Sequence, residues 1–195
     1  MRRAAVHQSL SYLLIAGGAL LLFLGARDFL ESRVGQSQAA RDFETSVPPA
    51  APAEPYRPPE PGETVARLTI PRLDAQLYVV EGDAAQELRR APGHLTGTAM
   101  PGEKGNCVIA GHRDTHFRVL KDIRKGDDIV LETRHGEFLY RVKNTRIVWP
   151  NNTSALQPTT GPELNLVTCY PFYYVGSAPR RFVVEARLAA AIPGS

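Results

Sequence analysis

The chain of 195 residues is long enough for one domain with a substantial core and too short for two of ordinary size. Its formal charge is only +3, and we find no basic stripe with interleaved aromatics of the kind that binds nucleic acid. The two cysteines, Cys107 and Cys169, exclude a disulfide-dense scaffold, a zinc ribbon and an iron–sulfur site, and leave one disulfide or free thiols.

The first element is an uncharged apolar run, Leu10–Ala26. About 20 residues are needed to cross a bilayer as a helix, and the polar residues before the run can lie at the interface. Arg2 and Arg3 precede it, which favours an N-terminus on the cytoplasmic side. The sequence therefore predicts a cytoplasmic segment over 1–8 and an uncleaved signal anchor over 9–27. A cleaved signal peptide is one alternative, although no convincing cleavage site follows, and a buried core helix is the other.

Residues 28–62 form the predicted extracytoplasmic stalk. Its first part is polar and mixed, and it is compatible with a continuation of the helix past the membrane. The stretch 47–62 contains seven prolines, which oppose helix and sheet and favour extended polyproline II. We interpret it as a semi-rigid spacer that lifts a domain off the membrane, with a proline-rich ligand for a partner module as the alternative.

From residue 63 to residue 192 the pattern changes to short β-branched runs broken by Gly, Pro, Asn and Asp. Two short segments, Ala84–Arg90 and His116–Ile123, look helical. Many short strands with few helices predict a mainly β fold, a closed or nearly closed β-barrel. The runs that indicate strands are Val65–Ile70, Leu77–Glu81, Asn106–Ala110, Asp128–Arg134, Glu137–Trp149, Leu164–Cys169 and Arg181–Leu188.

The candidate for chemistry is Cys169, which ends an apolar strand and enters a loop. Free cysteine usually packs in a core, so a structural thiol is the alternative. A cysteine nucleophile needs a partner that takes its proton. Of the five histidines, His7 precedes the membrane segment and His135 lies in a predicted hairpin turn. The remaining candidates are His94, His112 and His116.

His112 follows the apolar run of its strand and Gly111, a residue that permits a tight bend. Acyl transfer also needs a group that holds the developing oxyanion, and arginine can do so. Arg180 and Arg181 begin the last strand, which a return from Cys169 would place beside the thiol. Surface charges at a sheet edge are the alternative for this pair.

Three segments, in order, resemble the sortases, the membrane-anchored cysteine transpeptidases of bacterial envelopes. Ala110–Thr115 (AGHRDT) is similar to the histidine segment of the family, Leu166–Cys169 (LVTC) to its cysteine motif, and Pro179–Val184 (PRRFVV) to its arginine-bearing last strand. The extended forms around the histidine and the cysteine look most like class D. Asn165 departs from the family's usual threonine, a position that we expect to support the strand.

The resemblance implies an eight-stranded sortase-type barrel with Cys169 as the nucleophile and His112 as the acid/base. Arg181 is the implied oxyanion and substrate clamp, because the arginine of the family directly precedes the apolar run of the last strand. Arg180 would point to the opposite face of the strand. Three residues are supporting candidates: Thr168 to contact substrate or steady the site, Asp114 to orient His112, and His94 to lie near the site. A hydrogen bond within its own loop is the alternative for Asp114, and a structural or solvated role for His94.

The implied reaction is cleavage of a sorting signal of the leucine-proline-x-threonine type through a thioacyl enzyme, followed by transfer to an amine. Client proteins, a cell-wall precursor or pilin lysine, and water are the implied partners, and no metal or organic cofactor is required. An envelope cysteine peptidase using the same pair, or a non-catalytic binding module, are the rival functions. Cys107 is expected to pack in the core, with a redox-sensitive disulfide to Cys169 as the alternative.

Overall fold

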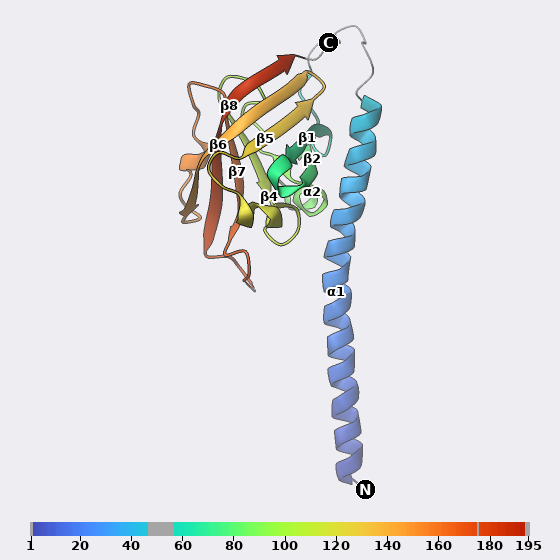
Figure 1. The fold of residues 1–195 in the computed structure, drawn as a ribbon. Helices are drawn as coiled ribbons and strands as arrows, with labels where there is room; N and C mark the ends of the chain where they lie inside the picture. The colour runs from blue at the N-terminus through green and yellow to red at the C-terminus, as the bar shows by residue number, and fades with distance from the viewer. Residues whose placement is uncertain (1, 47–56, 175, 194–195) are drawn as a thin grey trace.

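The structure, a computed structural model, describes residues 2–46, 57–174 and 176–193. Its first element is one continuous helix of 45 residues, α1 (Arg2–Ser46). At 1.5 Å per residue such a helix is about 68 Å long, and it extends far beyond the barrel that lies beside its second half (Figure 1). By length and composition α1 can cross a membrane, and its apolar window is not buried against the rest of the described chain.

The described residues after α1 form a closed eight-stranded barrel, with strand order β1-β2-β3-β4-β7-β8-β6-β5. Two neighbouring pairs, β2–β3 and β4–β7, are parallel, and the others are antiparallel. Short helices lie in the connections. The elements are β1 (Thr64–Ile70), η1 (Pro71–Leu73), β2 (Ala75–Glu81), α2 (Ala85–Arg90), β3 (Gly93–His94), β4 (Asn106–Gly111), η2 (His116–Asp122), β5 (Asp128–Thr133), β6 (Gly136–Val148), η3 (Ser154–Leu156), β7 (Glu163–Tyr170) and β8 (Arg180–Pro193).

The predicted barrel is confirmed, and all seven predicted strands are present with ends that differ by a few residues. The strand that the sequence does not reveal is β3, because its two residues are too few to show an alternating pattern. The helical prediction over His116–Ile123 is confirmed as η2, a 3₁₀ helix. The predicted hairpin at Gly136 joins β5 and β6.

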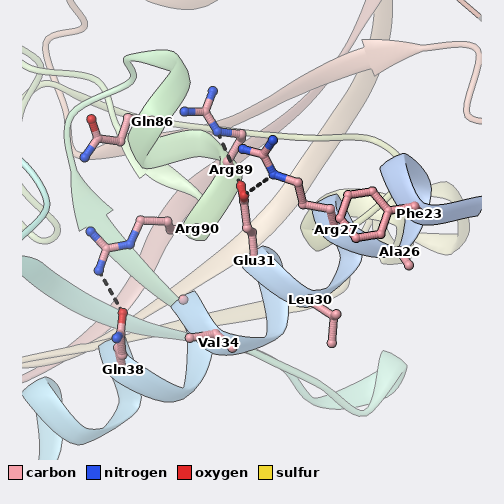
Figure 2. Close-up of a pocket in the computed structure, with 11 residues that line it drawn as sticks. Phe23, Ala26, Arg27, Leu30, Glu31, Val34, Gln38, Gln86, Arg89 and Arg90 are labelled. Carbon is pink, nitrogen blue, oxygen red and sulfur yellow. Dashed lines mark hydrogen bonds and ion pairs between the residues drawn. The ribbon is translucent and has the colours of Figure 1, made fainter. Parts of the chain in front are cut away.

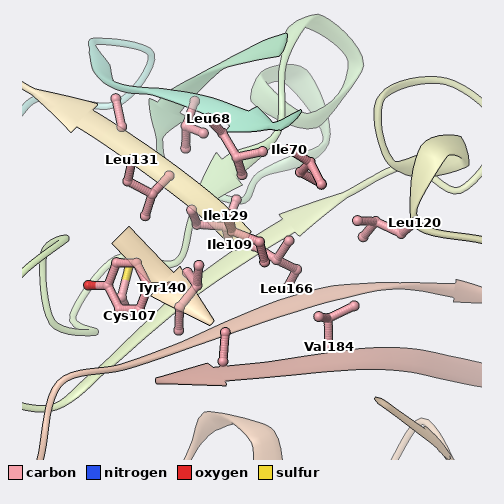
Figure 3. Packing of buried hydrophobic residues seen from close by; sticks show 14 of the residues in the cluster. Leu68, Ile70, Cys107, Ile109, Leu120, Ile129, Leu131, Tyr140, Leu166 and Val184 are labelled. Atoms are coloured by element: carbon pink, nitrogen blue, oxygen red, sulfur yellow. The ribbon is translucent and has the colours of Figure 1, made fainter. Parts of the chain in front are cut away.

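The barrel interior is filled by alternate side chains from its strands. Figure 3 shows Leu68, Ile109, Leu131 and Leu166 pointing into one cluster, and each of them is fully buried. Phe117 and Leu120 of η2 close one end of this cluster. Because successive residues of a strand face opposite sides, the members of this cluster fix which residues of each strand face outward.

A second cluster joins the C-terminal half of α1 to the barrel. Ala39 and Phe43 of α1 are buried against Tyr78 and Val80 of β2 and against Ala91. Helical residues four apart share a face, so these two form a stripe along α1. The stripe shows that the helix continues past the apolar run and docks on the domain.

Polar contacts reinforce this docking. The side-chain amide of Gln36 donates to the backbone carbonyl of Tyr78 at 2.9 Å and accepts from the Tyr78 amide at 2.8 Å. β3 pairs with β2 only at Val80 and Glu81, so Gln36 satisfies backbone groups that this short strand leaves unpaired.

The docking on α1 determines the position of the barrel differently from the predicted spacer. Residues 47–56 of the predicted proline-rich spacer lie outside the described residues. The barrel lies beside α1 and not beyond its end (Figure 1). Contacts with the helix, and not a spacer alone, therefore determine where the domain sits.

Candidate active site

Cys169 lies one residue before the end of β7 and is half-buried, with a free thiol. Leu164 and Leu166 of the same strand belong to the interior cluster. By the alternation of side chains, Cys169 is on the outer face of the barrel wall. The thiol is therefore displayed at a strand end on a rigid element.

The strand register brings the other two candidates to the same place. Cys169 pairs directly with Arg181 across the antiparallel ladder between β7 and β8. Side chains of directly opposed residues lie on the same face of a sheet, a few ångströms apart. On the other side of β7, Gly111 of β4 pairs with Thr168, and His112 follows as the next residue, level with Cys169. His112 is exposed. The three residues thus form a row at one end of three adjacent strands.

The two arginines have different environments. The guanidinium of Arg180 lies 4.3 Å from the centre of the Trp149 ring, a cation–π contact. Arg181 is half-buried, and its Nη1 donates to the carbonyl of Arg180 at 3.1 Å. Only Arg181 shares the face of Cys169, as the alternation along β8 predicts.

The segment that carries His112 is fixed by contacts with β7 and η2. The hydroxyl of Thr168 is buried and donates to the carbonyl of Gly111 at 2.6 Å, which ties β7 to the residue before His112. A Cβ atom added to Gly111 would lie 2.7 Å from the Phe117 ring. The glycine is therefore needed for the close packing of η2, which is a different reason from the tight bend predicted. This hydrogen bond is compatible with the supporting role expected for Thr168, and contact with substrate stays a prediction.

The other supporting candidates lie differently. Asp114 is exposed, and among the described residues the structure shows no hydrogen bond donated by His112 to it. His94 is buried in β3, where its Nδ1 is 2.7 Å from Glu81 Oε2 and its Nε2 is 3.1 Å from the carbonyl of Ala99. His94 pairs with Ile109 of β4, three residues before His112, and its burial and hydrogen bonds favour the structural alternative.

The pKa of the Glu81 carboxylate, which contacts His94, depends on its buried surroundings. Burial raises its pKa, but hydrogen bonds from His94 and from Thr96 outweigh burial and lower it. The pair stays hydrogen-bonded at 2.7 Å inside the protein. It joins β2 to β3 and is remote from the thiol.

Cys107 is 1% exposed and belongs to the interior cluster, which confirms its predicted packing role (Figure 3). Burial raises the pKa of this thiol far above its usual range. Cys107 pairs with Leu164, five residues before Cys169, and faces the opposite side of the barrel wall. A disulfide requires Cα atoms within about 7 Å, so the disulfide between the two cysteines is wrong for this fold.

Asn165 has the role expected of it. Its Nδ2 is buried and donates to Asn106 Oδ1 of β4 at 2.7 Å. The Nδ2 of Asn106 in turn donates to the carbonyls of Ala155 and Gln157, at 2.8 and 2.9 Å. This chain of bonds fixes the η3 segment over the outer face of β4 and β7, near the start of both strands.

Sequence reasoning missed Arg113, the residue after His112. It is buried, and its Nη2 donates to the carbonyls of Tyr174 and Gly176 at 2.8 and 3.0 Å. The guanidinium thus links the His112 segment to the connection between β7 and β8 that follows Cys169. No pattern around Arg113 distinguishes it from an exposed arginine, because its partners are backbone carbonyls some 60 positions away.

His116, the third candidate histidine, lies outside the row and contacts α1. It is buried between η2 and α1, with both ring nitrogens 3.4 Å from the hydroxyl of Ser32. Burial lowers the pKa of His116 to about 4, against weaker opposing effects that include the backbone of Arg89. His116 is therefore neutral near pH 7 and connects the His112 segment to the helix.

Among the described residues, no group of three or more His, Cys, Asp or Glu side chains is arranged to hold a metal ion. What the arrangement offers is an exposed imidazole, a half-buried thiol and a half-buried guanidinium in one row. A thiol, a proton carrier and a hydrogen-bond donor for an oxyanion are the groups that acyl transfer requires.

Comparison with known proteins gives a consistent result. The family model described as a sortase domain matches residues 68–189. Sortase D of Bacillus subtilis is 42% identical over 130 residues, which is 66% of this chain and 66% of that protein. Sortase SrtE1 of Streptomyces coelicolor is 33% identical over 155 residues, 70% of this chain and 43% of that protein.

The solved structures agree. The catalytic domain of B. anthracis SrtD is similar with a TM-score of 0.62 at 30% identity, over 74% of this chain and 100% of that one. A Clostridium perfringens Sortase D5 transpeptidase gives a TM-score of 0.70 at 24% identity, over 80% of this chain and 99% of that one.

Proposed function

Because this chain belongs to the sortase family of cysteine transpeptidases, we propose that it cleaves a sorting signal of the leucine-proline-x-threonine type in client proteins and transfers the acyl group to an amine. The observation that carries the proposal is the register of β4, β7 and β8, which aligns His112, Cys169 and Arg181 at one end of the barrel.

In the first step the proton of the Cys169 thiol passes to His112, and the sulfur attacks a backbone carbonyl of the sorting signal. The carbonyl oxygen gains negative charge, and Arg181 stabilises it with its guanidinium donors. The carbon–nitrogen bond then breaks, and His112 gives its proton to the departing amine. The product is a thioester between Cys169 and the client.

In the second step an amine of a cell-wall precursor or of a pilin lysine attacks the thioester. His112 takes the proton of the incoming amine, and the Cys169 sulfur leaves as thiolate. No residue outside the row has to move a proton. Thr168 and Arg113 hold the two segments of the site in place through their hydrogen bonds to the carbonyls of Gly111 and Tyr174.

We also propose that α1 anchors the enzyme in the cytoplasmic membrane as a single span, with the barrel on the extracytoplasmic side. The support is the apolar window of α1, which the described protein leaves unburied, and the arginines that precede it.

The test is capture of the thioester on the full chain in neutral detergent. Incubation with a library of leucine-proline-x-threonine peptides should give an adduct on Cys169, read by mass spectrometry, and added amine should release a new amide product. Cys169→Ala should lose the adduct and Cys107→Ala, which removes the buried thiol, should keep it. An adduct that only water discharges, even at high amine, would identify a hydrolase. Full activity of Cys169→Ala would exclude thiol catalysis.

A further inference from the structure

A groove lies between α1 and α2 at the point where the helix meets the barrel. Its cavity is about 550 Å³. Figure 2 shows that Phe23, Leu30 and Val34 of α1 form one wall and that Arg89 and Arg90 of α2 approach from the other side. The apolar side chains in the groove are exposed, 67% for Phe23 and 59% for Leu30. An apolar surface of this kind in contact with water is unfavourable unless something covers it.

The groove begins inside the apolar run and ends outside it. Phe23 and Ala26 belong to the run, and Gln38 lies three turns beyond it. If α1 spans the membrane as proposed, the groove opens sideways at the boundary between hydrocarbon and headgroups. The material next to it is lipid.

The polar side of the groove is positively charged. Arg27, Arg89 and Arg90 line it together with one carboxylate, Glu31, so three positive charges and one negative leave a balance of two positive charges. Arg27 Nε donates to Glu31 at 2.7 Å, and Arg89 Nε lies 3.6 Å from the same carboxylate. Arg90 donates only to the neutral side chain of Gln38, at 2.9 Å, among the bonds drawn in Figure 2.

We propose that this groove is a binding site for one anionic phospholipid, whose phosphate is held by Arg89 and Arg90 and whose acyl chains cover Phe23 and Leu30. Arginine binds phosphate with paired hydrogen bonds, and an acyl chain is the partner that an apolar wall continuous with a membrane span requires. The occupant would bridge α1 and α2 and hold the barrel against the helix. The proposal rests on the proposed membrane anchoring by α1.

The test uses the full chain in neutral detergent and measures the melting temperature through the fluorescence of its single tryptophan. The probes are dioleoyl phosphatidylglycerol, dioleoyl phosphatidylcholine and inorganic phosphate, each titrated separately. Phosphatidylglycerol should raise the melting temperature by a few degrees, as a ligand of the folded state does. Phosphatidylcholine and phosphate should not.

The variant Arg89→Gln/Arg90→Gln should weaken the apparent affinity for phosphatidylglycerol roughly tenfold or more, because two charge-assisted contacts are lost. Arg134→Gln/Arg141→Gln is the matched control, since it removes the same charge from exposed arginines of the β5–β6 hairpin that pair with Glu63 and Asp128. It should keep the wild-type response.

An equal response to phosphatidylcholine would overturn the proposal, because binding would then not depend on an anionic headgroup. The same response to inorganic phosphate, or an unchanged response in Arg89→Gln/Arg90→Gln, would overturn it as well. Cleavage of a soluble sorting peptide is measured on the same samples, and we expect Arg89→Gln/Arg90→Gln to retain it. A missing lipid response with intact cleavage counts against the groove alone, whereas missing cleavage with an intact lipid response counts against the enzymatic proposal alone.

Discussion

At the scale of single residues, the pairing of strands decides which of two adjacent arginines lies beside the thiol. Arg181 opposes Cys169 directly, while Arg180 opposes Tyr170 and contacts Trp149. Both are arginines at the start of the same strand, so their chemistry is identical. Their difference comes only from the alternation of side chains across the barrel wall.

We expect Arg181→Lys to lower kcat/KM for a sorting peptide by roughly 100-fold or more, because lysine keeps the charge but loses the planar pair of donors that faces an oxyanion. Arg180→Lys is the matched control and should change kcat/KM by less than about threefold, since its contact with Trp149 is a surface cation–π interaction. The measurement is steady-state cleavage by the full chain. Equal losses in both variants would contradict the assignment of the clamp to Arg181.

His116 gives the protein a defined dependence of stability on pH. Its pKa is lowered from 6.5 to about 4 by burial, with His112 lowering it further and Asp114 opposing. Above pH 6.5 the residue is neutral in the folded and the unfolded chain, so it adds no pH dependence there. Between pH 6.5 and pH 4 the unfolded chain takes up a proton that the folded chain refuses, and stability falls as the pH falls.

The expected loss from His116 across this window is at most about 3 kcal/mol, at 1.36 kcal/mol per pKa unit. His116→Gln should flatten the dependence of the unfolding free energy on pH below 6.5, as measured by denaturant unfolding of the full chain in detergent. His135→Gln, which alters an exposed turn histidine, should leave the slope as it is. An unchanged slope in His116→Gln would show that other groups cause the acid sensitivity.

At the scale of elements, α1 combines an apolar run and a surface that docks on the barrel in one helix. Its first part is the apolar run, and its second part carries the stripe of Ser32, Gly35, Gln36, Ala39 and Phe43 that contacts the barrel. Gly35 marks the closest approach, since a Cβ atom there would lie 2.4 Å from the carbonyl oxygen of Arg90 and 2.6 Å from its Cα. Backbone atoms of α2 cannot move aside as a flexible side chain can.

Gly35→Ala should therefore force α2 away from α1 and lower the unfolding free energy of the barrel by about 1–3 kcal/mol, the usual cost of overpacking. Alanine by itself favours a helix over glycine, so a loss can only come from the docking. Gly25→Ala on the same helix has nothing within 4 Å of the added Cβ atom and should leave barrel stability unchanged. Thermal unfolding of the full chain measures both. A Gly35→Ala protein as stable as the wild type would show that the two helices do not pack this tightly.

At the scale of the whole molecule, the docking orients the barrel on the helix. His116, which follows the His112 segment, contacts Ser32 of α1. Ser32 lies six residues beyond Ala26, the end of the apolar run, or about 9 Å at 1.5 Å per residue. The connection between β7 and β8 projects toward the N-terminal part of α1 (Figure 1). With α1 in the membrane as proposed, the end of the barrel that carries Cys169 faces the bilayer.

Removal of residues 1–56 should weaken both the fold and the site. It uncovers Tyr78, Val80 and Ala91 and leaves His116 without its contact to Ser32. We expect a fragment starting at residue 57 to melt at least about 5 °C below the full chain and to cleave a sorting peptide with a lower kcat/KM. Thermal unfolding and peptide cleavage measure these effects. A fragment equal to the full chain in both would show that α1 is only a tether.

Most of the barrel and its three central residues could be predicted from the sequence. The seven longer strands show β-branched runs with turn residues between them, and this signal is local. The apolar run of α1 is also local, and so are the segments around His112, Cys169 and Arg181 that resemble the sortases. For these features the residues that determine the structure are neighbours in the chain.

The remainder was decided by contacts between residues far apart in sequence. β3 exists because two residues find partners on both sides, and Gln36 becomes a structural residue because its amide meets the backbone of Tyr78. Cys107 and Cys169 are both cysteines on apolar strands, and only the closed barrel places one inside and the other on the outer face. The sequence by itself determined which segments form the seven longer strands, and it predicts a membrane span and the residues that carry the chemistry. Only the tertiary structure decided that the helix docks on the barrel. Most residues of the docking stripe, Ser32, Gly35, Gln36 and Ala39, are small or polar and carry little hydrophobic signal until the partner surface is present.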